Sequence, residues 1–326
     1  MGGQLVQNSQ FSRRATLNRI KSAFGVSTAS STSEAFQPPE TQTTYGLADK
    51  FEAEPLQNTY WIQAIGGWRE QSATTRSEAT SSALGGVVAG FDLPVFENWR
   101  VGLMGGYARS HTRIDALASK SSTDSYIFGA YAGTEISGFG LRFGGDYTWH
   151  NIDASRIDSV LGQSSTYSSN YNAKTAQIYA EASYQAHFGS VGLEPFANIA
   201  YVHQQTDDSV ETGGLAPLTS PSNSSAATFF TFGIRSEIQV QKNINLFGSI
   251  GWQHAFGDLD QTSNFSLGGN GNLQVSGASI VEDEAIFEAG LGISFNPNVS
   301  LNLSYRGQFA SGIREHGAKA QLIARF

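Results

Sequence analysis

The sequence contains no cysteine among its 326 residues, and charged side chains are scarce. The absence of cysteine excludes disulfide scaffolds, thiolate metal sites and cysteine nucleophiles. Charged residues make up 15% of the chain, against about a quarter in ordinary soluble proteins. The formal net charge of −8 argues against nucleic acid as a partner.

Long hydrophobic runs are also missing. No segment reaches about 18 consecutive apolar residues, so we expect no transmembrane helix. Residues 1–33 contain no apolar stretch of the kind that marks a secretory signal, which for an outer-membrane protein would indicate a fragment. The sequence is instead rich in glycine (36 residues) and aromatics (12%). That mixture suits a strand barrel with apolar side chains facing lipid and small or polar ones inside.

From Tyr60 onward, apolar and polar residues alternate. Every second residue from Ala176 to Phe188 is apolar, and most residues between them are polar. This period of two is the signature of a β-strand with two different faces. Twelve such segments centre on Ile62, Val87, Leu103, Phe128, Phe143, Ala180, Ala197, Ile234, Ile250, Ala289, Leu303 and Leu322. An even count is usual for bacterial single-chain barrels, so we predict an all-β, twelve-stranded antiparallel transmembrane β-barrel.

The connections between these segments alternate between long and short. Long polar connections cover residues 70–81, 112–122, 151–174, 204–226 and 258–283. Tight turns are expected at Pro94–Asn98, Ser137–Gly138, Gly189–Ser190, Lys242–Asn243 and Asn296–Asn298. Short turns on the periplasmic side and long loops outside are typical of membrane barrels. A soluble β-sandwich has no need for this asymmetry.

The first 58 residues have a different character. Leu17, Ile20 and Phe24 recur at helical spacing, which predicts a short amphipathic helix over residues 11–24. Its cations are Arg13, Arg14, Arg19 and Lys21. A stretch rich in serine, threonine and proline follows and is typical of a linker, within which residues 47–51 are a rival position for the helix. We therefore divide the chain into residues 1–58, helix and linker, and residues 59–326, the barrel.

The alternation also predicts which charged side chains point into the barrel. A charge facing lipid at mid-depth costs ~2–4 kcal/mol, so charged residues within the strands should face the lumen. This inward set comprises Arg142, Asp146, Glu181, Glu194, Arg235, Glu237, Glu288 and Arg306.

Several short sequences, taken in order over the segment from Trp61 to Phe326, resemble the autotransporter β-domain, the translocator of type V secretion, in its alphaproteobacterial form. They include Trp61-Ile-Gln-Ala-Ile-Gly-Gly-Trp68, Leu193-Glu-Pro-Phe196, Gly251-Trp-Gln-His-Ala-Phe-Gly-Asp258 and the terminal Phe326. The resemblance implies a helix inside the pore, a location in the bacterial outer membrane, and export of an N-terminal passenger. It also implies outer-membrane lipid and the barrel-assembly machinery as partners.

Two features of this sequence have functional interpretations in that context. A helix with four cations in a narrow lumen needs counter-charge, so it could dock onto acidic wall residues such as Glu181 and Glu288; the alternative is a generic hydrated lumen. Phe326 ends an alternating strand that includes Leu322, as an assembly signal would, although Ala324 stands where an aromatic is often found. An ordinary final strand is the alternative.

Evidence for chemistry in the loops is weak. His203 lies near Asp207 and Asp208 in the sequence, and His254 lies near Asp258, but no motif joins either pair into a base and nucleophile. The acidic run 282–284 could bind a hard cation, although solvated loop carboxylates are more common. We therefore expect no enzyme activity, no metal and no cofactor. A stand-alone pore, or an adhesin acting through its long loops, remains the alternative to a translocator.

Overall fold

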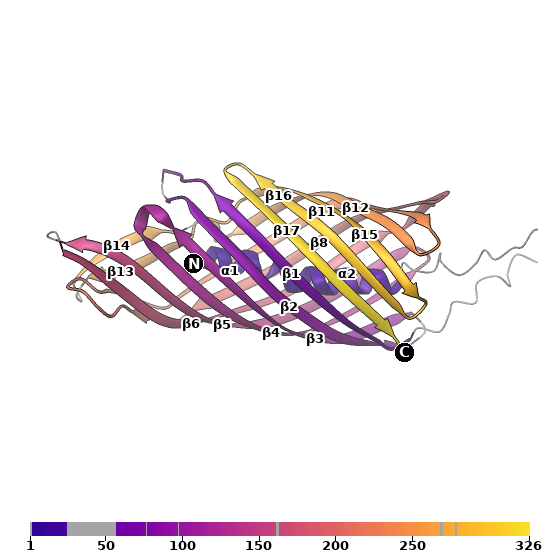
Figure 1. Cartoon of the computed structure of the whole chain (residues 1–326), viewed down its shortest axis with the longest axis horizontal. Helices are drawn as coiled ribbons and strands as arrows, with labels where there is room; N and C mark the ends of the chain where they lie inside the picture. Colours follow the sequence, from indigo (N-terminus) through magenta and orange to yellow (C-terminus); the bar gives the residue numbers. More distant parts are fainter. Residues whose placement is uncertain are drawn as a thin grey trace, which may run out of the picture.

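The computed structural model describes residues 2–24, 57–75, 77–96, 98–160, 163–267, 270–277 and 279–326. Twelve long strands form a closed antiparallel barrel with a helical segment inside it (Figure 1), which confirms the predicted fold. The strands are β1 (Thr59–Gln71), β2 (Thr80–Val95), β3 (Trp99–Ile114), β4 (Ser119–Ile136), β5 (Phe139–Val160), β6 (Gln163–Tyr184), β8 (Val191–Thr206), β11 (Asn223–Gln241), β12 (Ile244–Gly257), β15 (Asp283–Asn296), β16 (Val299–Ala310) and β17 (Ile313–Arg325).

Each long strand pairs with its neighbours in sequence order, and β17 returns to pair with β1. This seam joins Thr59 to Arg325 at one end and Gln71 to Ile313 at the other. A short strand, β7 (Ala186–Phe188), follows β6 after Gln185 and pairs with β8. Closure leaves no unpaired edge within the ring, as a strand protein in lipid requires.

The side chains alternate across the barrel wall as the sequence predicts. Ile62, Leu103 and Phe128 are exposed on the outer face, whereas Gln63 and Gln177 are buried inside. Each of the twelve predicted centres falls within one of the twelve long strands. An apolar exterior around a polar interior is the arrangement of a barrel whose solvent is lipid.

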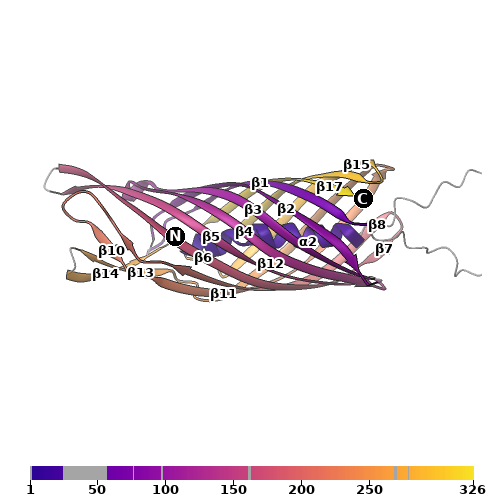
Figure 2. The same ribbon diagram turned by 90° about the horizontal axis from the view of Figure 1, so that it is seen from below.

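The two ends of the barrel differ. The tight turns lie at the end that also holds the C-terminus (Figure 1). At the opposite end, β9 (Ser209–Val210), β10 (Leu218–Ser220), β13 (Thr262–Leu267) and β14 (Asn270–Ser276) form a separate four-stranded sheet. Figure 2 shows this sheet beyond the main ring. We call the two ends the turn side and the loop side.

One predicted loop is wrong. Residues 151–174 were expected to be a long polar connection, but β5 and β6 each continue to 22 residues and pair from Phe139–Tyr184 out to Val160–Gln163. Outside the lipid there is no need for an apolar face, so these strands lose the alternation that identifies a membrane strand. The shorter connection between β3 and β4 contains a 3-10 turn, η1 (Asp115–Leu117).

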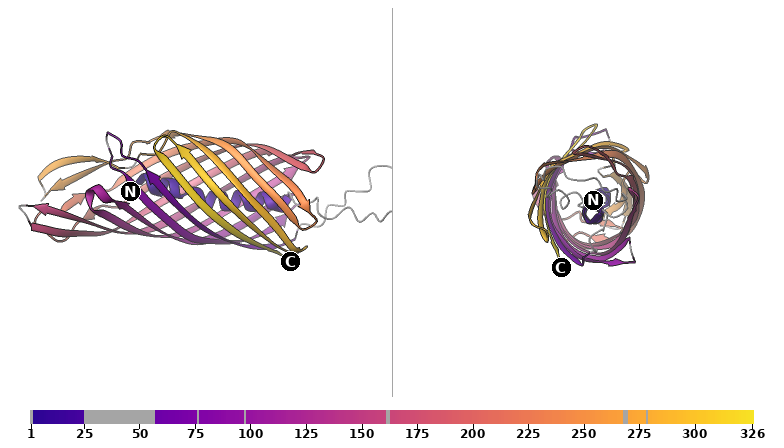
Figure 3. Two further views of the ribbon diagram at one scale, coloured as in Figure 1. Left: turned by 45° about the horizontal axis from the view of Figure 1, so that its top comes forward. Right: turned by 90° about the vertical axis from the view of Figure 1, so that its right-hand side faces the viewer.

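The lumen holds two consecutive helices, α1 (Gly2–Asn8) and α2 (Gln10–Phe24). Viewed along the barrel, they lie within the ring of strands (Figure 3). The helical segment therefore begins at Gly2, earlier than the expected start at residue 11. Residues 25–56 of the predicted linker, including the rival helix position at 47–51, lie outside the described residues. Neither described helix is long and apolar enough to cross a membrane.

Candidate functional site

The candidate site is the lumen with its enclosed helix. Buried residues of α2 include the apolar Leu17 and Ile20 but also Arg13, Thr16 and Arg19. A helix buried on polar and apolar faces alike needs polar partners all round, because an unpaired polar group in the interior is costly. The barrel wall supplies these partners in four groups along the helix.

The first group lies near the turn side and centres on Asp92 of β2. Arg19 of α2 donates Nε and Nη2 to the two carboxylate oxygens of Asp92, at 2.6 and 2.9 Å. Both side chains are 1% exposed. Arg100 of β3 also donates Nε to this carboxylate at 2.6 Å, and the hydroxyl of Tyr131 donates to it at 3.0 Å. A two-pronged arginine–carboxylate pair fixes both distance and orientation.

Asp92 was not among the charged residues predicted to face the lumen. Its place on β2 follows the same alternation, because Val88 and Gly90 share its face and the exposed Val87 lies on the other. The pattern could have found it. What the sequence does not show is that Arg19, 73 positions away, would meet it.

A second group of charges lies on the wall beside the end of α2. Glu181 and Glu194 each accept from both Arg142 and Arg235, with distances of 2.7–3.3 Å. Lys21 of the helix reaches Glu194 at 3.4 Å. Five of the predicted residues are thus brought together here, and four of them belong to the wall.

The third group surrounds the middle of the helix. Ser12 donates to Asp146 at 3.0 Å, and Arg13 donates to the side-chain oxygen of Gln177 at 3.0 Å. The amide of Gln177 in turn donates to the carbonyl of Ser9 at 2.7 Å and to Asp146 at 2.7 Å. These bonds hold the junction between α1 and α2, where the hydroxyl of Ser9 bonds to the carbonyl of Val6.

The fourth group lies above the third, toward the loop side. Gln10 and Gln308 of β16 exchange amide hydrogen bonds at 3.0 and 3.2 Å. Gln308 also donates to Glu284, which pairs with Arg69 at 3.0 Å, and Arg69 pairs with Glu315 at 2.8 Å. Arg14 donates to Gln10 within its own helix.

The remaining predicted residues do not touch the helix through a hydrogen bond or ion pair within the described part of the chain. Glu288 pairs with Lys319 at 2.7 Å, and Glu237 accepts from Asn245. Arg306 is half-buried, and its Nε and Nη2 have no partner among the described residues. Docking of the basic helix onto the acidic set is therefore found at Glu194, through Lys21, whereas Glu181 and Glu288 are occupied by cations of the wall.

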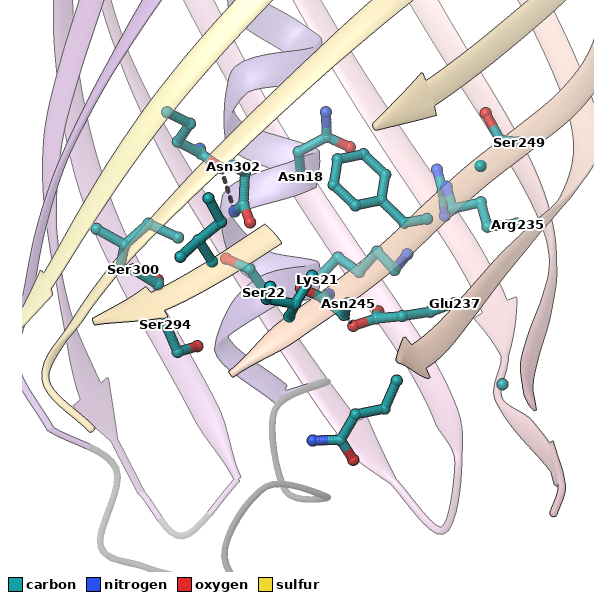
Figure 4. Close-up of a pocket in the computed structure, with 18 of the residues that line it drawn as sticks. Asn18, Lys21, Ser22, Arg235, Glu237, Asn245, Ser249, Ser294, Ser300 and Asn302 are labelled. Carbon is teal, nitrogen blue, oxygen red and sulfur yellow. Dashed lines mark hydrogen bonds between the residues drawn. The ribbon is translucent and has the colours of Figure 1, made fainter. Parts of the chain in front are cut away.

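A polar cavity remains beside the helix at the turn side. It has a volume of about 420 Å³, and Asn18, Lys21 and Ser22 line it from the helix. Asn245, Ser294 and Asn302 line it from the facing strands (Figure 4). The helix contacts the wall formed by β3, β4 and β5 and leaves this opposite side open.

The loop residues considered for chemistry lie on the outer surface. His254 of β12 contacts Asp283 through Nδ1 at 2.8 Å and Glu282 through Nε2 at 3.7 Å. One ligand atom from each of His254, Glu282 and Asp283 lies within 4.8 Å of the others, but both carboxylates are exposed, as solvated acidic groups commonly are. His203 is exposed on β8 and has no hydrogen-bonded acid among the described residues.

A closed barrel with an apolar exterior and a helix-filled polar lumen defines an outer-membrane β-barrel of the translocator class. The family model of the autotransporter beta-domain matches residues 60–306, and the chain belongs to this family. Such translocators reside in the bacterial outer membrane and serve a passenger domain in type V secretion.

Solved structures and curated relatives agree with this family. The translocator domain of NalP from Neisseria meningitidis superimposes with a TM-score of 0.69 at 13% identity, over 84% of this chain and 90% of that one. The β-domain of the Bordetella autotransporter BrkA gives 0.64 at 14% identity, over 83% of this chain and 100% of that one. A protein named extracellular serine protease, from Serratia marcescens, is 34% identical over 82% of this chain. The match spans only 26% of that relative.

Proposed function

We propose that this chain anchors a passenger joined to its N-terminal side and passes it through the outer membrane, after which α1 and α2 remain in the lumen as a plug. One observation carries the proposal. The helical segment runs through the barrel from Gly2 near the loop side to Phe24 near the turn side. With loops outside the cell, a passenger preceding Gly2 emerges at the cell surface.

The contacts along the helix support a plug that stays in place. Each of the four polar groups joins the helix to the wall, and the strongest pair, Arg19–Asp92, is removed from solvent. Buried charges paired in good geometry are costly to separate, because separation leaves each charge without a partner. A freely conducting pore or a bare adhesin has no need of such a docked helix.

The proposal is tested by fusing a folded reporter upstream of Gly2 and treating intact cells with protease. We expect the reporter to be digested from outside, while the barrel and the helix survive until the membrane is disrupted. Removal of residues 59–326 should leave the reporter in the periplasm. A reporter that remains protected on intact cells when fused to the full chain would contradict the function.

Phe326 and Leu322 are proposed to form the signal read by the barrel-assembly machinery. Phe326 is 73% exposed, its ring lies 5.8 Å from that of Tyr60, and its amide donates to the carbonyl of Asn58. Deletion of Phe326 should reduce the folded fraction in the outer membrane, as judged by heat-dependent migration on gels. A matched Phe188→Ala change, at an exposed ring in another strand, should have less effect; equal losses would point to general destabilisation.

We assign catalysis to the passenger and none to the barrel. The relatives named serine proteases share with this chain only about a quarter of their length. Substitution of His203 or His254 should leave any activity of the secreted passenger unchanged. A loss of activity without a loss of secretion would instead indicate that the substituted histidine takes part in catalysis.

A further inference from the structure

A group of basic side chains lies on the outer face of the barrel, just beyond the aromatic residues on the loop side. Tyr107 of β3 and Tyr126 of β4 are exposed and lie opposite each other. The next outward positions along β3 are Arg109, His111 and Arg113, all of which are exposed. Aromatic rings of this kind mark the boundary between lipid tails and headgroups. The basic side chains therefore lie at headgroup depth.

Two of the cations directly oppose each other. Arg113 is the cross-strand partner of Lys120 on β4, and both point outward. Side chains in such positions are roughly 5 Å apart at Cβ, and like charges there are destabilising. This repulsion is unexplained by the protein alone, and a bound anion between the two side chains would remove it.

Nearby acids offset the group only in part. Asp153 accepts a hydrogen bond from Asn170, and Glu70 is the cross-strand partner of Arg314, so neither carboxylate is paired with a cation of the group. Arg113 lies 3.9 Å from Asp115, but the two side chains are 69% and 83% exposed, so the pair is weak. Arg109 lies 3.6 Å from Asp124, whose carboxylate also accepts from Tyr107. Lys120 has no ion pair within the described residues.

The same residues line a groove. Its volume is about 1110 Å³, and its lining includes Arg109, His111, Arg113 and Lys120, the serines Ser122 and Ser155, and the carboxylates Glu70 and Asp153. Guanidinium, ammonium and hydroxyl groups together are the donors that bind phosphate. Four residues of strand span roughly 13 Å, so Arg109 and Arg113 reach across a headgroup layer.

We propose that this face of β3 and β4 binds a phosphorylated lipid headgroup of the outer leaflet. The occupant is a membrane lipid because the cations directly follow the aromatic boundary and face outward. The surface is also local. At the same end of β12 and β15, the exposed outer residues are Glu282 and Asp283 around His254. An anionic headgroup would be repelled there, so binding should be confined to one side of the barrel.

The test uses the full chain in neutral detergent and measures lipid retained on the folded protein by native mass spectrometry. The probes are bisphosphorylated lipid A, its dephosphorylated form, and inorganic phosphate as competitor. We expect the phosphorylated lipid to be retained preferentially. Arg113→Ser together with Lys120→Ser should weaken its association roughly thirtyfold, because each cation near a membrane surface contributes about fivefold.

The matched control is Arg314→Ser. Arg314 is also exposed and outward on β17, but its cross-strand partner is Glu70, so its charge is already balanced. This change should leave lipid binding within about twofold of the original chain, and Arg113→Lys, which keeps the cation, should preserve most of it.

Three outcomes would overturn the proposal: equal retention of the dephosphorylated lipid, an equal loss in Arg314→Ser, or full displacement by millimolar inorganic phosphate. The last would identify a free-phosphate site in place of a lipid site. Far-UV circular dichroism and heat-dependent gel migration verify that each variant is folded before its binding is compared.

Discussion

The two ends of the lumen helix are held by different forces. Residues 2–10, on the loop side, rely on apolar packing and neutral hydrogen bonds: Leu5 packs with Ile152 and Ala173, and Gln10 pairs with Gln308. Residues 19–24, on the turn side, combine the apolar packing of Ile20 and Phe24 with charged contacts through Arg19 and Lys21. Under the proposed function, a passenger would pull on the helix from the loop side. The strongest fixed contact therefore lies at the end farthest from the load.

This comparison teaches which contacts resist extraction. Apolar contacts tolerate small shifts, whereas the Arg19–Asp92 pair has one geometry and loses much when it is displaced. Three substitutions test the difference.

The largest effect is expected for Asp92→Ala. The change leaves Arg19 and Arg100 buried without their carboxylate, at a cost of about 3–5 kcal/mol. The helix should shift within the lumen or leave it, so single-channel conductance in planar bilayers should rise. The melting temperature of the barrel should fall. Asp124→Ala, at a surface carboxylate, is the control and should change neither quantity. Unchanged conductance and an unchanged melting temperature in Asp92→Ala would show that the turn-side contacts are not the main ones that hold the helix in the lumen.

An intermediate effect is expected for Leu5→Ala. Leu5 is 2% exposed, and truncation leaves a cavity against Ile152. We expect a loss of about 2 kcal/mol, at the lower end for a buried leucine, because the cluster is small. Thermal unfolding should detect this loss while conductance stays low. Leu215→Ala, at a side chain that is 81% exposed, is the matched control. Conductance as high as in Asp92→Ala would show that both ends hold the plug equally.

The smallest effect is expected for Lys21→Met. Lys21 approaches Glu194 at 3.4 Å, but Glu194 keeps Arg142 and Arg235 when the lysine is removed. The amine is also partly exposed, so we expect a loss below about 1 kcal/mol. Melting and conductance should both remain close to those of the original chain. An increased conductance in this variant would show that Lys21, and not Arg19, makes the main contact that holds the helix.

Much of the barrel could be predicted from the sequence because lipid imposes a simple rule on each strand. Positions such as Leu103 and Phe128 had to be apolar, and Arg142 and Glu181 had to face inward. This rule does not apply to the parts of the strands that extend beyond the lipid. Beyond the lipid the outward face of β5 and β6 no longer needs apolar residues, while Ile152 and Tyr167 are buried on the inward face, so the membrane-strand pattern ends there and the sequence predicts a loop.

The partners in the lumen could not be predicted, for a different reason. Alternation gives the direction of a side chain but not its neighbour across the lumen, which depends on register and on the position of the helix. Arg19 meets Asp92 rather than Glu181 because Arg142 and Arg235 already occupy Glu181. The start of the helix was missed because Gly2 and Gly3 have poor helix propensity, which enclosure by the wall overrides.

The seam between β1 and β17 also sets an order of events. It joins residues more than 240 positions apart, from Gln71–Ile313 to Thr59–Arg325. Contacts so distant in sequence carry the largest loop-closure entropy and form late in folding. Until they form, the sheet is an open trough, and Asp92, one strand from that gap, is accessible from the side. We therefore expect the helical segment to enter the lumen through the open side of the sheet. It is then enclosed when β17 pairs with β1, and it does not have to pass through a closed barrel.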